Sequence, residues 1–154
     1  LKPGEAIFQD AGILHAYLEG QNLEIMANSD NVLRGGLTNK KIDVPELLKL
    51  VRFEPVVPQI IKGLKVNDSM EEAFITPAAD FELRRIILAS NSSTEITCHT
   101  TDIFLVTEGT ISASANKITI PLKKGECFLS TEGAVIHFHS GSEGAVVFHA
   151  TVPE

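Results

Sequence analysis

The sequence predicts an all-β chain that contains the closing strands of one jelly roll, a short connecting helix and the whole of a second jelly roll. Two observations support this fold class. From Glu72 onward, short runs rich in Val, Ile, Phe and Thr alternate with turn residues, a spacing typical of antiparallel sandwiches and barrels. The opening segment also recurs near the C-terminus, which indicates that one structural unit is used twice.

The first forty residues are expected to form strands and loops. Short apolar runs bounded by turn residues predict three strands, at 6–8, 15–18 and 23–27. A turn at Pro3–Gly4 precedes the first strand, and a loop rich in Asn and Ser at 28–31 follows the third. Gly35–Gly36 then permits close backbone approach.

A single helix is expected to start near Asp43, because Pro45 and Glu46 follow in the positions that favour a first turn. Its apolar face would comprise Leu47, Leu48, Leu50 and Val51. The Glu-Pro-Val-Val-Pro run at 54–58 ends the helix and forms a stiff, extended connector. A domain boundary is therefore expected between about residues 40 and 58.

The C-terminal half predicts a complete antiparallel unit of short strands. Gly, Asn, Ser and Lys-Lys-Gly turns separate eight apolar runs, at 81–88, 93–98, 103–106, 110–115, 118–120, 126–130, 134–139 and 145–150.

The internal repeat aligns residues 1–15, LKPGEAIFQDAGILH, without gaps to residues 122–136, LKKGECFLSTEGAVI. His15 of the first copy corresponds to Ile136 of the second, and His137 is one residue out of phase, on the opposite face of its strand. The second unit is therefore expected to have no metal site. His137 and His139 share a face and could form a pair, but they are expected to be surface or packed histidines.

Composition excludes several classes of function. The 154 residues are 44% hydrophobic and 21% charged, as in an ordinary globular protein, and no apolar run approaches a membrane span. A net charge of −7 argues against nucleic-acid binding. No secretory signal is visible, and the only two cysteines, Cys98 and Cys127, lie in apolar runs where free thiols are common. A reducing, cytoplasmic setting is expected.

The most informative stretch brings together five polar side chains, His15, Tyr17, Glu24, Arg34 and Lys40, in one short segment that is expected to be rich in strands. A histidine, a carboxylate and an arginine from neighbouring strands suit a metal ion and an anionic, sugar-like ligand.

The residues HAYLEGQNLEIMANSDNVLRGGLTNKK, at 15–41, resemble the C-terminal part of the catalytic domain of type I mannose-6-phosphate isomerases. The likeness runs through His-Ala-Tyr, Ser-Asp-Asn-Val-x-Arg-x-Gly-Leu-Thr and the following Lys, and continues more weakly to the end of the chain. It implies cupin-type jelly rolls, divided into residues 1–42 as the end of a catalytic cupin, 43–62 as a helical connector and 63–154 as a C-terminal cupin without metal.

The resemblance also implies a zinc-dependent aldose–ketose isomerase, with a Gln, two His and a Glu as zinc ligands. His15 matches the last of these ligands, and the other three would lie upstream of this chain. Arg34 matches the active-site arginine of the family, Glu24 and Tyr17 match residues that line the pocket, and Lys40 matches a lysine at its edge. With one ligand of four, the chain alone is expected to be an inactive fragment that needs the missing N-terminal part of the same protein.

Several alternatives stay open. Glu24 could be a buried, hydrogen-bonded carboxylate, Arg34 a structural ion-pair partner, and Lys40 part of a solvated pair with Lys41. His99 and Asp102 fall roughly where a jelly-roll metal motif carries ligands, and are interpreted as remnants. The whole chain could instead be a non-catalytic sugar- or anion-binding cupin protein, or a structural fragment that self-associates through exposed strand edges.

Overall fold

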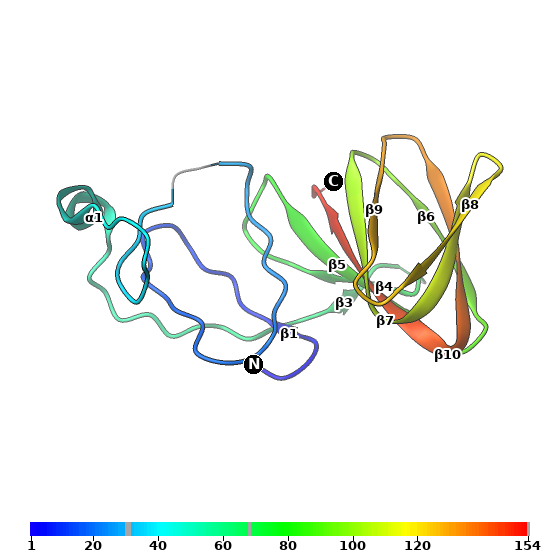
Figure 1. The fold of residues 1–154 in the computed structure, drawn as a ribbon, viewed down its shortest axis with the longest axis horizontal. Helices are drawn as coiled ribbons and strands as arrows, with labels where there is room; N and C mark the ends of the chain where they lie inside the picture. Colours follow the sequence, from blue (N-terminus) through cyan, green and yellow to red (C-terminus); the bar gives the residue numbers. More distant parts are fainter. Residues whose placement is uncertain (30–31, 68, 154) are drawn as a thin grey trace.

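The structure is a computed structural model that describes residues 1–29, 32–67 and 69–153 (Figure 1). It divides into an extended N-terminal segment with one short helix, and a C-terminal barrel of antiparallel strands. Residues 30 and 31 of the predicted 28–31 loop lie outside the described residues. No helix in the described ranges is long and apolar enough to cross a membrane.

The C-terminal barrel confirms the predicted antiparallel unit. Its strands are β3 (Leu64–Lys65), β4 (Glu71–Phe74), β5 (Glu82–Leu88), β6 (Ser93–Thr97), β7 (Asp102–Ala115), β8 (Ile118–Lys123), β9 (Cys127–Ser130) and β10 (Val135–Thr151). The main path of hydrogen-bonded neighbours runs β3-β4-β5-β10-β7-β8, with β6 added to β10 and β9 added to β7. Every pairing in this sheet is antiparallel.

Two long strands give the barrel its closed shape, because each changes partners along its length. The first part of β10 pairs with β6 and its last part pairs with β5. In the same way, β7 pairs with β9 near its start and with β8 near its end. The two strands also pair with each other along most of their lengths (Figure 1). One layer of the barrel therefore contains β6, β8, the start of β10 and the end of β7, and the other contains β5, β9, the end of β10 and the start of β7.

The prediction of separate strands at 103–106 and 110–115, and at 134–139 and 145–150, was wrong. Each pair forms one continuous strand. The glycines between them, read from the sequence as turns, are bend points inside the strands. Gly109 has φ +69° and Gly144 φ +75°, and the β7–β10 register shifts between Ser140 and Ala145 and again between Val146 and Val147. A bulge with a glycine at positive φ bends a strand without ending its ladder.

The barrel core is aromatic and aliphatic, as alternation along the strands predicts. Phe104 lies at its centre, stacked 5.0 Å from Phe128 and tilted 5.3 Å from Phe138, measured between ring centroids. Ile86 and Val147 are fully buried beside it. Ile136, the counterpart of His15, is also buried in this cluster.

The predicted helix is confirmed as α1 (Val44–Leu50). The Asp43 side chain caps it by accepting a hydrogen bond from the backbone N–H of Glu46 at 3.2 Å. Its predicted apolar face is only partly covered: Leu47 is half-buried, whereas Leu48 and Leu50 are exposed.

The N-terminal segment differs most from the prediction. Only β1 (Glu5–Ala6) forms, paired with β2 (Ile61–Lys62), and the expected strands at 15–18 and 23–27 are absent. A strand needs a neighbour that satisfies its backbone N–H and C=O groups. Within the described part of the chain, no second strand lies beside either run, so both are extended without a ladder.

The internal repeat is visible in the backbone. Gly4 and its counterpart Gly125 have φ +82° and +88°. In each copy, the glutamate that follows this glycine accepts a hydrogen bond at 2.9 Å from the lysine N–H three residues before it. Gly12 and its counterpart Gly133 have φ +79° and +78°. The same two turns are therefore built at both ends of the chain.

A candidate active site on the N-terminal segment

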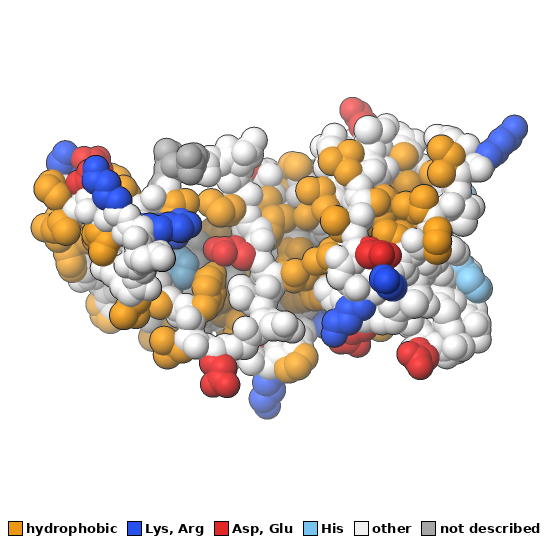
Figure 2. Space-filling view, viewed as in Figure 1, with side chains coloured by type: hydrophobic (Ala, Val, Ile, Leu, Met, Phe, Trp, Pro, Cys, Tyr) orange, Lys and Arg blue, Asp and Glu red, His pale blue; other side chains and the backbone are white. Residues whose placement is uncertain are grey.

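A groove of about 1600 Å³ lies between the N-terminal segment and the outer face of the barrel. The barrel contributes a mainly apolar wall, formed by side chains of β4, β5, β7 and β10 that include Phe74, Leu83, Ile87, Leu105, Val146 and Phe148. Figure 2 shows hydrophobic side chains gathered along this part of the molecule. His15, Tyr17 and Glu24 line the groove from the opposite side.

His15 is exposed to solvent on the side of the groove opposite the barrel wall. Its Nδ1 atom lies 3.0 Å from the carbonyl oxygen of Ile13, so Nδ1–H donates and the Nε2 lone pair points elsewhere. The ring of Tyr17 contacts the imidazole edge to face, with centroids 5.7 Å apart. The backbone thus fixes the tautomer that a metal-binding histidine needs.

Tyr17 and Glu24 form the second part of the site. Partial burial of the phenol, together with the charge of Glu24 and a hydrogen bond to its carboxylate, raises the pKa of Tyr17 above 10.0. The hydroxyl therefore keeps its proton at neutral pH and donates to the carboxylate. The alternative of a purely buried carboxylate at Glu24 does not describe the structure, because Glu24 is exposed.

Arg34 and Lys40 lie outside the group formed by His15, Tyr17 and Glu24. Arg34 is half-buried and Lys40 is exposed, and neither lines the groove. The chain beside Arg34 nevertheless approaches the His15 segment, because a Cβ at Gly35 would lie 2.8 Å from the Leu14 side chain. Convergence of all five predicted residues is therefore only partial: the structure brings His15, Tyr17 and Glu24 together and places Arg34 close by along the chain.

The donors present suit one position of a zinc site. In the described ranges, no group of three or more His, Cys, Asp or Glu side chains is arranged to hold a metal ion. The oriented imidazole of His15 fits as a single ligand, because zinc binds neutral histidine nitrogen and a second hydrogen bond sets the ring direction.

The barrel histidines at 137 and 139 are surface residues. His137 lies 3.0 Å from the exposed carboxylate of Glu95, and His139 is hydrogen-bonded to the Ser93 hydroxyl at 2.9 Å. Ile136 points into the core instead. The second copy therefore has a buried aliphatic side chain at the position where the first copy has the exposed His15.

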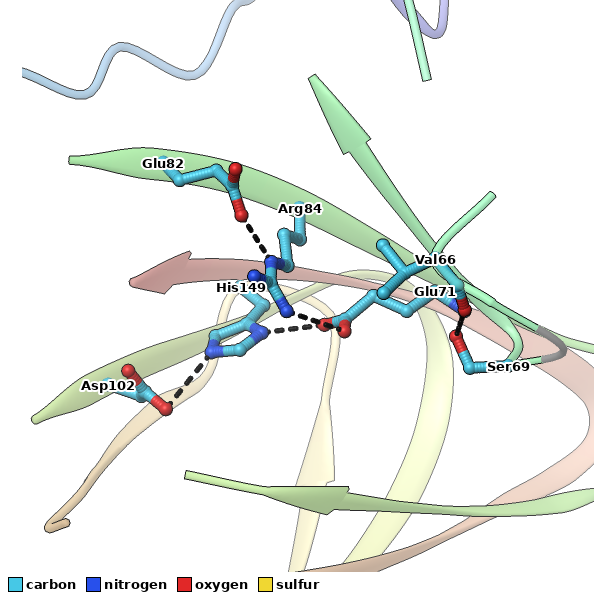
Figure 3. A network of polar contacts seen from close by, with 7 residues as sticks. All are labelled: Val66, Ser69, Glu71, Glu82, Arg84, Asp102 and His149. Atoms are coloured by element: carbon cyan, nitrogen blue, oxygen red, sulfur yellow. Dashed lines mark hydrogen bonds and ion pairs between the residues drawn. The ribbon is translucent and has the colours of Figure 1, made fainter. Parts of the chain in front are cut away.

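A buried polar network inside the barrel was missed from the sequence (Figure 3). His149 is 2% exposed and stacks on Phe104, with ring centroids 4.3 Å apart. Its Nδ1 lies 2.7 Å from Glu71 Oε1, and its Nε2 lies 3.2 Å from Asp102 Oδ2. Asp102, interpreted from the sequence as a metal-site remnant, is 1% exposed and contacts this imidazole.

Arg84 completes the network from β5. Its guanidinium contacts Glu71 Oε2 at 3.2 Å and also binds Glu82. Burial opposes its charge, but the hydrogen bond to Glu82 and the charges of Glu71 and Glu82 raise the pKa of Arg84 above its ordinary value. Nearby, burial raises the pKa of the Cys98 thiol to about 11, so this thiol is neutral. A period-two reading of β4, β5 and β10 would have placed Glu71, Arg84 and His149 on the inner face.

Comparisons with known proteins agree with this architecture. No family model matches the chain. A mannose-6-phosphate isomerase of Salmonella typhimurium is 43% identical over 126 residues, which are 82% of this chain and 32% of that protein. The isomerase of Rattus norvegicus is 35% identical over 160 residues, covering all of this chain and 36% of that protein. The chain thus spans about a third of the length of the curated relatives that it matches.

A solved structure gives the same result in three dimensions. The mannose 6-phosphate isomerase of Salmonella typhimurium, bound to its substrate fructose 6-phosphate and a zinc atom, superposes with a TM-score of 0.66 at 30% identity. The match covers 84% of this chain and 32% of that one. Since structures of this kind are cupins, the jelly-roll fold class is confirmed.

Proposed function

This chain is a relative of the mannose-6-phosphate isomerases, and we propose that it supplies part of the active site of such an enzyme. The reaction would interconvert mannose 6-phosphate and fructose 6-phosphate. The observation that carries the proposal is the His15–Tyr17–Glu24 group that lines the groove. These residues belong to a chain whose whole length aligns with an isomerase of Rattus norvegicus at 35% identity. The other zinc ligands would come from residues outside this chain, in the N-terminal part of the same protein.

His15 is the residue that would hold zinc, through the Nε2 atom left available by the hydrogen bond from Nδ1 to Ile13. Bound zinc acts as a Lewis acid toward the oxygens of a sugar. Orientation of the imidazole by a backbone carbonyl keeps the ligand in one tautomer, so little reordering accompanies metal binding.

Arg34 and Glu24 are the proposed catalytic residues. Isomerisation moves a proton between C1 and C2 through a cis-enediol, and negative charge develops on its oxygens. Arg34 carries a permanent charge and a planar fork of donors, which suits either this charge or the phosphate group. Glu24 would bind a sugar hydroxyl or transfer a proton, and the hydrogen bond from Tyr17 to its carboxylate supports this role.

Tyr17 and Lys40 are proposed to contact the substrate. The Tyr17 ring packs on His15, and its hydroxyl is kept protonated beside Glu24. Lys40 is exposed, with its backbone N–H bonded to the Thr38 hydroxyl at 3.1 Å. Its ammonium group would bind the phosphate from the edge of the site.

The barrel is proposed to form a C-terminal cupin domain, residues 63–154, that supports the catalytic part without binding metal. Its outer face extends the apolar wall of the groove beyond the N-terminal segment: Ile103 and Leu129 pair across β7 and β9 and are 48% and 60% exposed. Residues 1–42 would belong to the catalytic cupin, with 43–62 as connector. An exposed apolar face of this kind is typical of an interaction surface. The N-terminal part of the same protein would cover it, and without that part the chain would self-associate.

A cytoplasmic location is also proposed. Two free cysteines, buried Cys98 and exposed Cys127, are the kind of thiols that persist in a reducing compartment.

The test is an isomerase assay on the complete protein that contains this chain, with mannose 6-phosphate as substrate. We expect fructose 6-phosphate to form, activity to disappear on chelation and to return with zinc. Mannose without phosphate should react far more slowly, because it lacks the group that Arg34 or Lys40 would bind. Binding of mannose 6-phosphate by calorimetry without any turnover would instead support the sugar-binding cupin.

A further inference from the structure

The end of helix α1 is attached to the chain immediately before His15. The backbone N–H of Arg52 donates to the carbonyl oxygen of Gly12 at 2.9 Å. The Arg52 guanidinium also lies 2.9 Å from Asp10 Oδ2, across 42 residues of sequence. These two contacts join the connector to the turn at residues 10–13.

Gly12 makes this attachment possible. Its φ of +79° is unfavourable for other residues, and a Cβ there would lie 2.8 Å from the carbonyl oxygen of Leu50 and 3.2 Å from Arg52 Cγ. The last turn of the helix therefore packs directly on the glycine backbone. Any side chain at this position would push the turn and the helix apart.

The turn leads without interruption to the proposed zinc ligand. Ile13 follows Gly12, and its carbonyl oxygen accepts the hydrogen bond from His15 Nδ1 at 3.0 Å. A displacement of the turn would therefore move the very group that sets the direction of the imidazole. In the absence of strand neighbours within the described residues, the helix end is the main backbone anchor of this part of the chain.

We propose that Gly12, Asp10 and Arg52 form a positioning clamp, by which the end of the connecting helix sets the orientation of the His15 imidazole for metal binding. The inference rests on the proposed function. Gly12, Asp10 and Arg52 are positioning residues, because they act on the metal through the backbone rather than by touching it.

The internal repeat supplies a matched control for the glycine. Gly133 has φ +78°, almost the same as Gly12, but a Cβ at Gly133 would meet nothing within 4 Å. Gly12→Ala and Gly133→Ala therefore impose the same backbone strain and differ in the contact with the helix end. The zinc dissociation constant, measured by competition with a chromophoric chelator, should rise about tenfold in Gly12→Ala and stay within about twofold in Gly133→Ala.

The ion pair has its own control on the same helix. Arg52→Ala should weaken zinc binding about threefold, as expected for an exposed pair, and Arg52→Lys should restore most of the loss. Lys49→Ala removes the exposed Lys49–Glu46 pair and should leave zinc affinity unchanged. If Gly12→Ala does not fold, the comparison of zinc affinity between Arg52→Ala and Lys49→Ala still tests the proposal.

Three outcomes would overturn the clamp. They are an unchanged zinc constant in folded Gly12→Ala, equal losses in Gly12→Ala and Gly133→Ala, and equal effects of Arg52→Ala and Lys49→Ala. In each case the unaltered protein binds zinc, so the proposed function would survive. Failure of the unaltered complete protein to bind zinc would remove both proposals.

Discussion

The Nδ1 atom of His149 lies 2.7 Å from the Oε1 atom of Glu71, and both side chains are almost completely buried. The pair joins β10 to β4 across the inside of the barrel (Figure 3). Asp102 Oδ2 lies 3.2 Å from Nε2 of the same imidazole, and Arg84 contacts the same Glu71 carboxylate, each from a further strand. Side chains of four strands thus meet at one buried polar centre.

Loss of one partner from this centre should destabilise the barrel strongly. Glu71→Gln removes a carboxylate that binds both His149 and Arg84, and should lower the free energy of unfolding by about 3–5 kcal/mol, the usual cost of breaking a buried ion pair. Chemical denaturation measures the change. The control is Glu95→Gln at the exposed His137 contact, where a change below about 1 kcal/mol is expected. Equal effects would show that burial of the network contributes nothing.

The bend between the two barrel layers should depend on a glycine. A Cβ at Gly109 would collide with the carbonyl oxygen of Gly144, and the φ of +69° adds backbone strain. Gly109→Ala should cost about 3 kcal/mol or more, from strain and overpacking together. Gly125→Ala has φ +88° but open space around it, and should cost about 1 kcal/mol. Thermal or urea unfolding of the two variants compares these costs directly.

The buried thiol of Cys98 should make the free energy of unfolding fall at alkaline pH. Burial raises the pKa of its thiol from 9.0 to about 11. Between these values the unfolded chain releases a proton that the folded chain keeps, so the free energy of unfolding should fall as pH rises from about 9 to about 11. The fall should be smaller in Cys98→Ala. An identical pH profile in both proteins would contradict a neutral, buried thiol.

Tyr17 is the only tyrosine in the chain, so ultraviolet titration of the phenol reports on this residue alone. Burial and Glu24 raise its pKa, and the midpoint should lie above 10.0. Glu24→Gln removes the carboxylate charge and should lower the midpoint toward the ordinary value. Glu19→Gln, an exposed change in the same segment, should leave it in place. A midpoint that is insensitive to Glu24 would rule out the contact.

Much of the barrel was predictable from local patterns. Each predicted strand after residue 80 coincides with a strand or part of one, and Asp43 caps the helix as its sequence indicates. The continuity of β7 across Gly109 and of β10 across Gly144 was not predictable. A glycine between two apolar runs is equally typical of a turn that separates two strands and of a bulge within one strand. The absent strands at 15–18 and 23–27 show that apolar runs form ladders only beside a partner.

The grouping of the proposed site residues was only partly predictable from the sequence. The residues at 15, 17 and 24 lie together as expected, whereas the side chains of Arg34 and Lys40 do not line the groove. The Glu71–His149 pair escaped notice because its members are 78 residues apart, and only the strand register places them face to face. A side-chain contact that depends on the register of strands far apart in the sequence cannot be recognised from a local motif.

The most direct measurement is the zinc content and turnover of the complete protein with His15→Ala, compared with His137→Ala. Both histidines are exposed, but only His15 lines the groove. The account predicts that His15→Ala loses bound zinc and isomerisation of mannose 6-phosphate, while His137→Ala keeps both. Full zinc occupancy and unchanged turnover in His15→Ala would contradict the central claim that this chain completes a zinc isomerase site.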